Sequence, residues 1–216
     1  MLAEQLRSRE PEENSEIGAV LKIRSKNKKM TEIPVICKIL TSTNHWDTIY
    51  ETAATPQIGA EKLIVRHFTN APNQYFHARA ENSSDLLPEL ESLSPAGATI
   101  PLAGSDFWLT DLGLDFLHWP EQRRLKGELR LNQSCYVLES SDPDGEEIVR
   151  VKSWIDKKSN GILVAEAYNR KKQKVKEFSL SGSSFKKIKG HWQLEKMDIH
   201  NAKTGSQTTL KFNLPK

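Results

Sequence analysis

The chain has few cysteines, and this scarcity excludes one class of metal site. Its 216 residues contain two, Cys37 and Cys135, which lie far apart in the sequence. Zinc sites built on CxxC pairs need cysteines a few residues from one another, so sites of this kind are excluded. Each cysteine alternates in phase with apolar neighbours, and we therefore predict two buried, unpaired thiols.

Long apolar runs are also lacking. No stretch approaches the roughly 18 uninterrupted apolar residues that a membrane-spanning helix needs. Residues 1–16, MLAEQLRSREPEENSE, contain no apolar core of the kind that secretory signal peptides have. Glycine and proline, at 11 and 10 residues, are too few for a low-complexity chain. The composition predicts one compact, strand-forming domain.

The surplus of one sign of charge is small. The chain has 31 Lys and Arg residues against 28 Asp and Glu residues, which gives a net charge of +3. So small a surplus argues against a dedicated DNA-coating protein, although local basic patches remain possible, and no nucleic-acid partner is expected. The basic groups Arg24–Lys29, Arg170–Lys176 and Lys186–Lys189 flank predicted turns, where lysine keeps strand edges from pairing. We expect these to be solvated turns, and contact with an anionic membrane surface or partner is the alternative.

Catalytic and metal-binding motifs are absent or incomplete. The sequence has no HExxH, no GxSxG and no phosphate-binding glycine-rich loop. Residues 142–147 resemble the start of a calcium loop but lack its later ligands, so a hairpin turn is expected. His67 and His77 could face each other across a hairpin, although half-exposed strand histidines are the simpler interpretation. No catalytic residue, metal site or cofactor is predicted.

What the sequence does contain is alternation of apolar and polar residues with a period of two. Early examples are Ala19–Leu21–Ile23 and Val35–Cys37–Ile39, and similar runs return after Arg124 and continue to the end. Turn-type residues such as Asp142–Gly145 and Lys189–Gly190 join the later runs. About ten to twelve strands in one domain predict a large antiparallel sheet that curls.

Short helices interrupt this pattern. They are predicted over Leu2–Arg9, around Asp85–Leu93, over Asp106–Leu112 with Ser105 as N-cap, and over Leu114–Trp119. Because the helical residues gather in mid-chain and do not alternate with the strands, a parallel α/β sheet is not expected. Near the C-terminus, Trp192–His200 is predicted to form one strand.

The mid-chain segment Pro101–Trp119 is unusually apolar. Two short helical turns cannot bury its many leucine and aromatic side chains on one ordinary surface face. Two interpretations remain open. The segment either plugs one end of the sheet as core, or forms a lid over an apolar cavity that the sheet encloses.

Several motifs, taken in order, resemble those of a known family. Residues 104–107 (GSDF) are followed by Asp111–Leu112, and the later motifs are YVLE at 136–139, SWID at 153–156, LVAEAY at 163–168, FKKIKGHW at 185–192 and MDIHN at 197–201. Together they resemble the outer-membrane lipoprotein-sorting protein family, the LolA-like periplasmic carriers, from about Ala19 to Phe212.

The resemblance implies a mainly β, α+β fold: an unclosed, strongly curved antiparallel half-barrel with short helices packed in its concave face as a lid. It implies a non-catalytic periplasmic carrier that shields lipid acyl chains for lipoprotein sorting to the outer membrane. Residues 1–18 would be an N-terminal helix and linker, and residues 19–216 a single carrier domain. Because the family is exported, the native signal peptide is expected to have been removed from this chain.

The alternation assigns candidate residues to this carrier. The candidate cavity wall is the inward face of the early strands: Leu21, Ile23, Val35, Ile39, Trp46, Leu63 and Val65. The candidate lid residues are Phe107, Leu112, Leu114 and Phe116. The expected partners are lipid acyl chains or a lipoprotein anchor, together with membrane-bound donor and acceptor proteins, and a monomer is expected. The alternative is a protein-interaction or envelope-stress sensing domain of the same fold with a packed interior.

Overall fold

A computed structural model of the chain describes residues 2–180, 184–188 and 191–215. Most of the described strands belong to one large antiparallel sheet. Its strands are β1 (Ser15–Arg24), β2 (Met30–Thr41), β3 (Trp46–Thr52), β4 (Glu61–His67), β5 (Gln74–Arg79), β6 (Glu91–Leu93), β7 (Glu121–Arg130), β8 (Gln133–Ser141), β9 (Arg150–Asp156), β10 (Ile162–Tyr168), β11 (Lys174–Ser179), β14 (Lys196–Asn201) and β15 (Gln207–Phe212). A separate hairpin is formed by β12 (Phe185–Ile188) and β13 (His191–Leu194).

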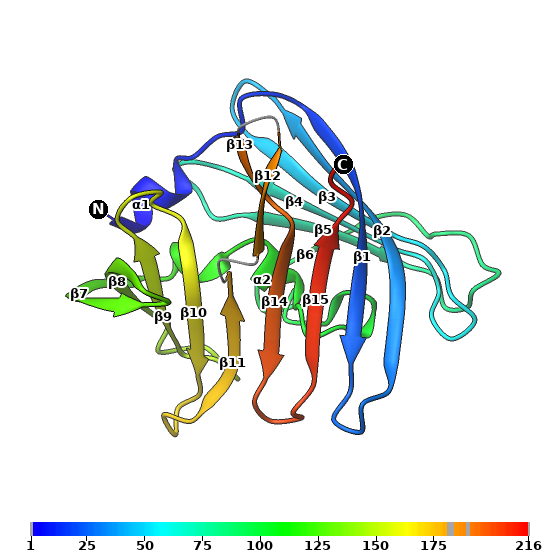
Figure 1. Cartoon of the computed structure of the whole chain (residues 1–216). Coiled ribbons are helices and arrows are strands. Elements are labelled where there is room, and N and C mark those ends of the chain that lie inside the picture. The colour runs from blue at the N-terminus through cyan, green and yellow to red at the C-terminus, as the bar shows by residue number, and fades with distance from the viewer. Residues whose placement is uncertain (1, 181–183, 189–190, 216) are drawn as a thin grey trace.

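The order of the strands leaves the sheet open. It runs β6-β5-β4-β3-β2-β1-β15-β14-β11-β10-β9-β8-β7, so the first and last strands of the chain pair in its middle. Ala19 of β1 lies opposite Phe212 of β15, and Ala19 also lies opposite Val35 of β2. The edges β6 and β7 do not pair with each other, and the sheet curves strongly between them (Figure 1). The predicted unclosed half-barrel is therefore confirmed.

The chain between the two edge strands lies inside the curve. It contains the short helices η1 (Leu102–Gly104), α2 (Leu109–Leu112) and η2 (Asp115–His118), drawn in green in Figure 1. We call residues 101–119 the inner segment. Leu102, Phe107 and Leu109 are buried against the concave face of β1–β5, β14 and β15 and form the larger hydrophobic core with it.

A second core lies under the other half of the sheet. The N-terminal helix α1 (Leu2–Arg7) packs on η2, and its Ala3 is buried beside Phe116 and Leu117. Leu138 and Ile155 of β8 and β9 complete this core. Strand β1 begins at Ser15, within the range expected to be a linker. Among the described residues, no helix has the length and apolar character needed to cross a membrane.

One predicted helix is wrong. The chain around Asp85–Leu93 forms no helix: residues 81–90 are an exposed loop, and Glu91–Leu93 is the short edge strand β6. Pro88 explains the difference, because proline lacks the N–H that a helix interior needs and disfavours helical backbone in the residue before it.

Two further boundaries differ from the prediction. Ser105 does not cap the helix in the inner segment; its Oγ accepts the backbone N–H of Phe107, and α2 begins only after Trp108. The strand predicted over Trp192–His200 is two strands, β13 and β14, that break at Glu195 and belong to different sheets. The turn predicted at Lys189–Gly190 lies outside the described residues.

The two cysteines are unpaired, as predicted. Cys37 of β2 is buried in the larger core, whereas Cys135 of β8 is buried in a small cluster with Val137 and Trp154. They therefore lie in different halves of the sheet.

Candidate functional site

Three buried carboxylates tie the inner segment to the sheet. Glu61 of β4 accepts the backbone N–H of Ala103 at 2.7 Å, and its other oxygen lies 2.7 Å from Nε2 of His77. Asp106 accepts hydrogen bonds from the hydroxyl groups of Ser206, at 2.6 Å, and Thr208, at 2.9 Å. The GSDF motif therefore fastens the start of the inner segment to β15.

The third carboxylate is that of Asp115 in η2. It accepts hydrogen bonds from the Tyr75 hydroxyl and from the Trp119 indole N–H, both at 3.3 Å. Burial raises the pKa of Asp115, although the two hydrogen bonds oppose the shift. Gly113 permits this approach, because a Cβ at that position would collide with the Tyr75 hydroxyl.

An ion pair holds the helix α2 itself. Nζ of Lys176 on β11 lies 2.7 Å from Oδ2 of Asp111, and the same carboxylate oxygen accepts the backbone N–H of Trp108 at 2.7 Å. Lys176 is only 2% exposed, and its Nζ also lies 3.4 Å from the centroid of the Trp108 ring. Burial lowers the pKa of this lysine, and the Asp111 charge counteracts the shift.

A cleft of about 390 Å³ opens beside the inner segment. Its lining is mostly apolar and comes from both halves of the sheet as well as from α1. The apolar side chains are those of Leu6, Trp46, Tyr50, Phe68, Phe107, Leu112, Leu114, Leu117, Ile162, Phe178, Leu180 and Met197. The polar ones are those of Arg7, Arg9, Thr48, His67, Asn73, Asp111, His118 and Asn160.

Two histidines of the cleft are uncharged at neutral pH. Burial lowers the pKa of His67 to about 4, with a further contribution from His118. Burial and the nearby Arg7 charge lower the pKa of His118 to about 4 as well. The His67 ring stacks on Trp46 with a centroid distance of 5.1 Å, and its Nε2 lies 3.1 Å from the Thr48 hydroxyl. These contacts fix His67 as part of the cleft wall.

The candidate cavity residues fall into two groups. Trp46 lines the cleft, whereas Leu21, Val35, Leu63 and Val65 are buried beneath the inner segment and make the larger core. Ile23 is partly buried against that core, and Ile39 is partly buried on β2. The inward face predicted by alternation thus serves as core where the inner segment covers it and as cleft wall at Trp46.

The candidate lid residues also lie in different environments. Phe107, Leu112 and Leu114 line the cleft, although Phe107 is at the same time a fully packed member of the core. Phe116 lines a smaller void of about 40 Å³ between the inner segment and β9–β11. Leu114, which is 36% exposed, has a left-handed backbone with φ of 51°.

Some residues of the site were missed by sequence reasoning. Lys176 was assigned to a solvated basic turn, and the structure corrects this because its side chain is buried against Asp111. The sequence does carry a signal for the burial of Lys176: it stands two residues before Phe178, and this spacing places both side chains on one face of β11. Arg7 and Asn73 carried no such signal, because they reach the cleft only through the docking of α1 and the β4–β5 turn.

Among the described residues, no three His, Cys, Asp or Glu side chains are grouped so that they could hold a metal ion. The residues at 142–147 form a turn between β8 and β9. His77 contacts Glu61 and His67 contacts Thr48, so the two histidines have different partners.

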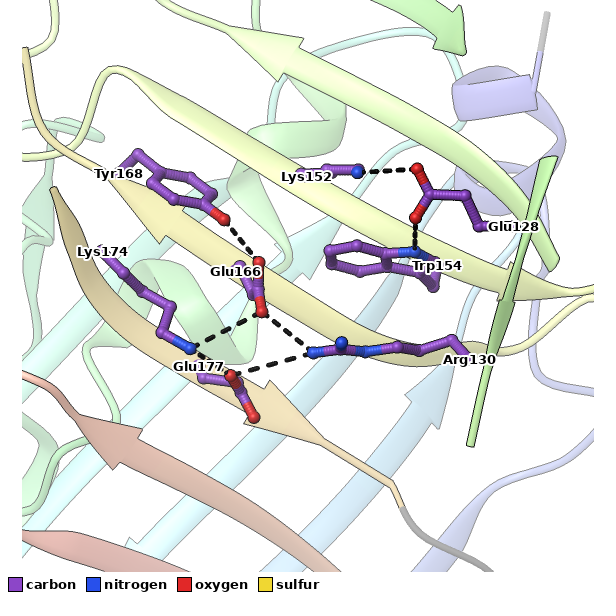
Figure 2. A network of polar contacts seen from close by, with 8 residues as sticks. All are labelled: Glu128, Arg130, Lys152, Trp154, Glu166, Tyr168, Lys174 and Glu177. Carbon is purple, nitrogen blue, oxygen red and sulfur yellow. Dashed lines mark hydrogen bonds and ion pairs between the residues drawn. The ribbon is translucent and has the colours of Figure 1, made fainter. Parts of the chain in front are cut away.

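The outer face of β7–β11 carries a polar network that lies away from the cleft lining (Figure 2). Its members are Glu128, Arg130, Lys152, Trp154, Glu166, Tyr168, Lys174 and Glu177. Arg130 donates to Glu166 at 2.9 Å, and Lys174 lies 2.6 Å from Glu177. Glu128 accepts from the Trp154 indole at 2.8 Å. Because positive and negative groups alternate and neutralise each other, this network joins neighbouring strands and presents no surplus charge to a ligand.

Comparisons with known proteins agree on the fold. A domain from Vibrio parahaemolyticus designated an outer membrane lipoprotein-sorting protein domain superimposes with a TM-score of 0.77 at 18% identity, over 98% of this chain and 87% of that one. A DUF1329 family protein from Desulfovibrio piger gives 0.75 at 18% identity, over 98% and 88%. A LolA superfamily protein from Nitrosomonas europaea gives 0.65 at 16% identity, over 99% and 92%. The resemblance seen in the sequence motifs is thereby confirmed for the fold.

The sequence itself matches one family model. A model described as "-like: Uncharacterized protein" covers residues 87–216, which include the whole inner segment and every later strand. No curated protein matches the sequence.

Proposed function

The chain belongs to the family whose model matches residues 87–216, and from its LolA-like fold we propose that it is a carrier that shields lipid acyl chains. The observation that carries the proposal is the apolar cleft of about 390 Å³ beside the inner segment. Its volume lies within the range of about 300–1,000 Å³ in which proteins enclose small molecules.

The physics of lipid transfer suits such a cleft. Each methylene group that leaves water gains about 0.8 kcal/mol, so a carrier must offer an environment nearly as apolar as the membrane if loading and unloading are to balance. Aliphatic and aromatic side chains such as Trp46, Leu112 and Phe178 provide that environment without directional bonds. Binding then depends on removal of apolar surface from water and is tolerant of chain identity.

The inner segment would act as the lid. Its first part is fixed to the core by Phe107 and Asp106, whereas Leu112 and Leu114 form the wall of the cleft. Because α2 is one turn long, a small displacement of Leu112 and Leu114 would widen the cleft while the Phe107 anchor stays in place. The proposal assigns no chemistry to the site: the carrier is non-enzymatic and needs no cofactor.

The proposal places the carrier in the periplasm. Its cargo would be a lipoprotein anchor or another acyl lipid on the way to the outer membrane, taken from one membrane-bound protein and passed to another. A monomer suffices, since one chain provides the whole cleft. The support for this role is the lipoprotein-sorting designation of the Vibrio parahaemolyticus domain with the same fold.

The alternative is a protein-interaction or envelope-stress sensing domain of the same fold. The packed core under Leu102, Phe107 and Leu109 favours it, because much of the concave face is filled. The cleft favours the carrier, because a domain that needs only a packed interior has no use for an open apolar space.

Native mass spectrometry of the chain purified without detergent separates the two. The carrier predicts adducts with the mass of acyl lipids or, after delipidation, uptake of added fatty acid. Leu112→Trp, which fills the cleft, should reduce that uptake, whereas Leu129→Trp at an exposed position of β7 should not. Absence of adducts and of uptake in the unaltered chain would favour the interaction domain.

A further inference from the structure

The part of the cleft wall formed by α1 and the residues that follow it is cationic. Arg7 of α1 and Arg9, which follows that helix, line the cleft together with His118 of η2. Asp111 also lines the cleft, but its charge is already paired with Lys176. The cleft therefore combines a mostly apolar wall with two guanidinium groups.

The contacts of the two arginines leave their charges available. Nη1 of Arg7 donates to the backbone oxygen of Leu117 at 2.8 Å, and Nη2 of Arg9 donates to that of Ser159 at 3.4 Å. Both acceptors are neutral carbonyl groups. Glu4, one turn earlier on α1, is exposed, and its charge interacts with that of Arg7; solvent screens interactions between charges at such exposed positions.

Arg7 also has an unused donor. Its Nε is buried and has no hydrogen-bond partner among the described residues. Buried donors are paired in most native structures, with protein groups, water or a ligand. A guanidinium group offers its donors in a planar fork that fits carboxylate and phosphate oxygens.

The neighbouring histidine adds no charge to this part of the cleft. The pKa of His118 is lowered to about 4 by burial and then by the Arg7 charge. His118 is consequently neutral near pH 7, and it adds a polar ring without a second buried charge.

We propose that the cleft takes a single-chain anionic amphiphile, an acyl chain that ends in a carboxylate or a phosphate monoester, with the anionic group at Arg7 and Arg9. This rests on the proposed acyl-chain function and adds to it the charge of the ligand's head group. The volume of about 390 Å³ lies near the lower end of the range for small-molecule sites, which suits one acyl chain.

The test compares head groups on one chain length. Binding of palmitate, palmitoyl lysophosphatidic acid and hexadecanol to the delipidated full chain is measured below the critical micelle concentration of the two anionic ligands and below the solubility limit of hexadecanol. We expect the two anionic ligands to bind about tenfold more tightly than hexadecanol, which corresponds to about 1.4 kcal/mol. Binding of only one anionic ligand would also support the site and would identify carboxylate or phosphate as the group it takes.

Variants assign the preference to the two arginines. Arg9→Gln should reduce the preference for palmitate over hexadecanol severalfold without affecting the fold, because Arg9 is exposed and makes one long hydrogen bond. Arg7→Gln should reduce it further, and Arg7→Lys should restore part of it. Arg123→Gln, which removes the same charge from an exposed position on β7, should leave it unchanged.

Equal affinity for palmitate and hexadecanol would overturn the head-group site while leaving the acyl-chain cleft in place. A preference that persists in the Arg7→Gln/Arg9→Gln double variant would also overturn it. Failure of all three ligands to bind would instead remove the proposed function on which the inference rests. If Arg7→Gln proves unstable, the ligand preference of Arg9→Gln alone tests the head-group site, because α1 does not depend on the Arg9 side chain.

Discussion

Lys176 and Asp111 form a buried ion pair that joins the sheet to the inner segment. The lysine stands on β11 and the carboxylate on the single turn of α2, with 2.7 Å between Nζ and Oδ2. Their side chains differ in exposure, at 3% for the lysine and 27% for the aspartate. The two partners should therefore respond differently to substitution.

Asp111→Ala should destabilise the protein by about 3 kcal/mol, because it leaves the Lys176 charge buried without a partner. Lys176→Met should cost less, about 1 kcal/mol, since Asp111 can be hydrated and methionine fills the lysine volume. Urea unfolding measures both. Glu147→Ala, in an exposed pair with Lys203, is the control and should cost well under 1 kcal/mol. Equal losses for Asp111→Ala and Lys176→Met would contradict this account of the pair.

Substitutions at Phe107 and Leu114 should distinguish the anchored part of the inner segment from the part that forms the exposed wall of the cleft. Phe107→Ala should cost about 3–5 kcal/mol, the usual loss for a packed phenylalanine. Leu114→Gly should change stability by less than about 1 kcal/mol, because glycine relieves the left-handed backbone while exposed apolar contact is lost. Fluorescent fatty acid should bind Leu114→Gly at least as tightly as the unaltered chain. A large loss of stability for Leu114→Gly would place this residue in the packed core.

The cleft histidines predict that stability falls in mild acid. The pKa of His67 and of His118 is about 4 in the folded protein, below the ordinary value near 6.5. The unfolded chain therefore binds protons first, so stability is complete above about pH 6.5 and is lost as the pH falls toward about 4. For the more buried His67 the loss at pH 5 is at most about 2 kcal/mol.

Denaturant unfolding at pH 7 and pH 5 measures this effect. His67→Asn should weaken the dependence and leave the part due to His118, whereas His200→Asn, at an exposed position of β14, should preserve the whole of it. A profile that is the same in His67→Asn and in the unaltered chain would show that His67 is not the group responsible.

The thiols give an independent check on the core. Burial raises the pKa of Cys37 to about 12, so thiolate-directed reagents should modify this residue very slowly in the folded protein. Denaturation without reductant should release two titratable thiols. Detection of none would mean that the cysteines form a disulfide, and the separate burial of Cys37 and Cys135 would then be incorrect.

The strand alternation was sufficient to predict a large, curled antiparallel sheet and the inward face of the early strands, whereas the unclosed half-barrel with helices inside it followed from the resemblance of the motifs. Leu21, Val35 and Leu63 are buried because each stands in phase with apolar neighbours on a face that the inner segment covers. Alternation could not say what covers each position. Trp46 has the same inward phase on β3, yet it meets the cleft because the path of the inner segment leaves it uncovered.

The remaining errors have local and non-local causes. Pro88 stood in the sequence and could have ruled out the helix around Asp85–Leu93. In contrast, the burial of Lys176 depends on Asp111, which is distant in the sequence and reaches β11 only when the inner segment folds into the concave face. Arg7 likewise becomes part of the cleft only when α1 docks on the inner segment, where it donates to the backbone oxygen of Leu117.

The most direct test of acyl-chain binding uses Trp46, whose side chain lines the cleft. A brominated fatty acid quenches tryptophan fluorescence only at close contact, so its titration into the delipidated chain reports the position of the acyl chain. The account predicts saturable quenching that falls substantially in Trp46→Phe while affinity changes little. No quenching, or quenching of the same extent in Trp46→Phe, would contradict the claim that the cleft holds an acyl chain.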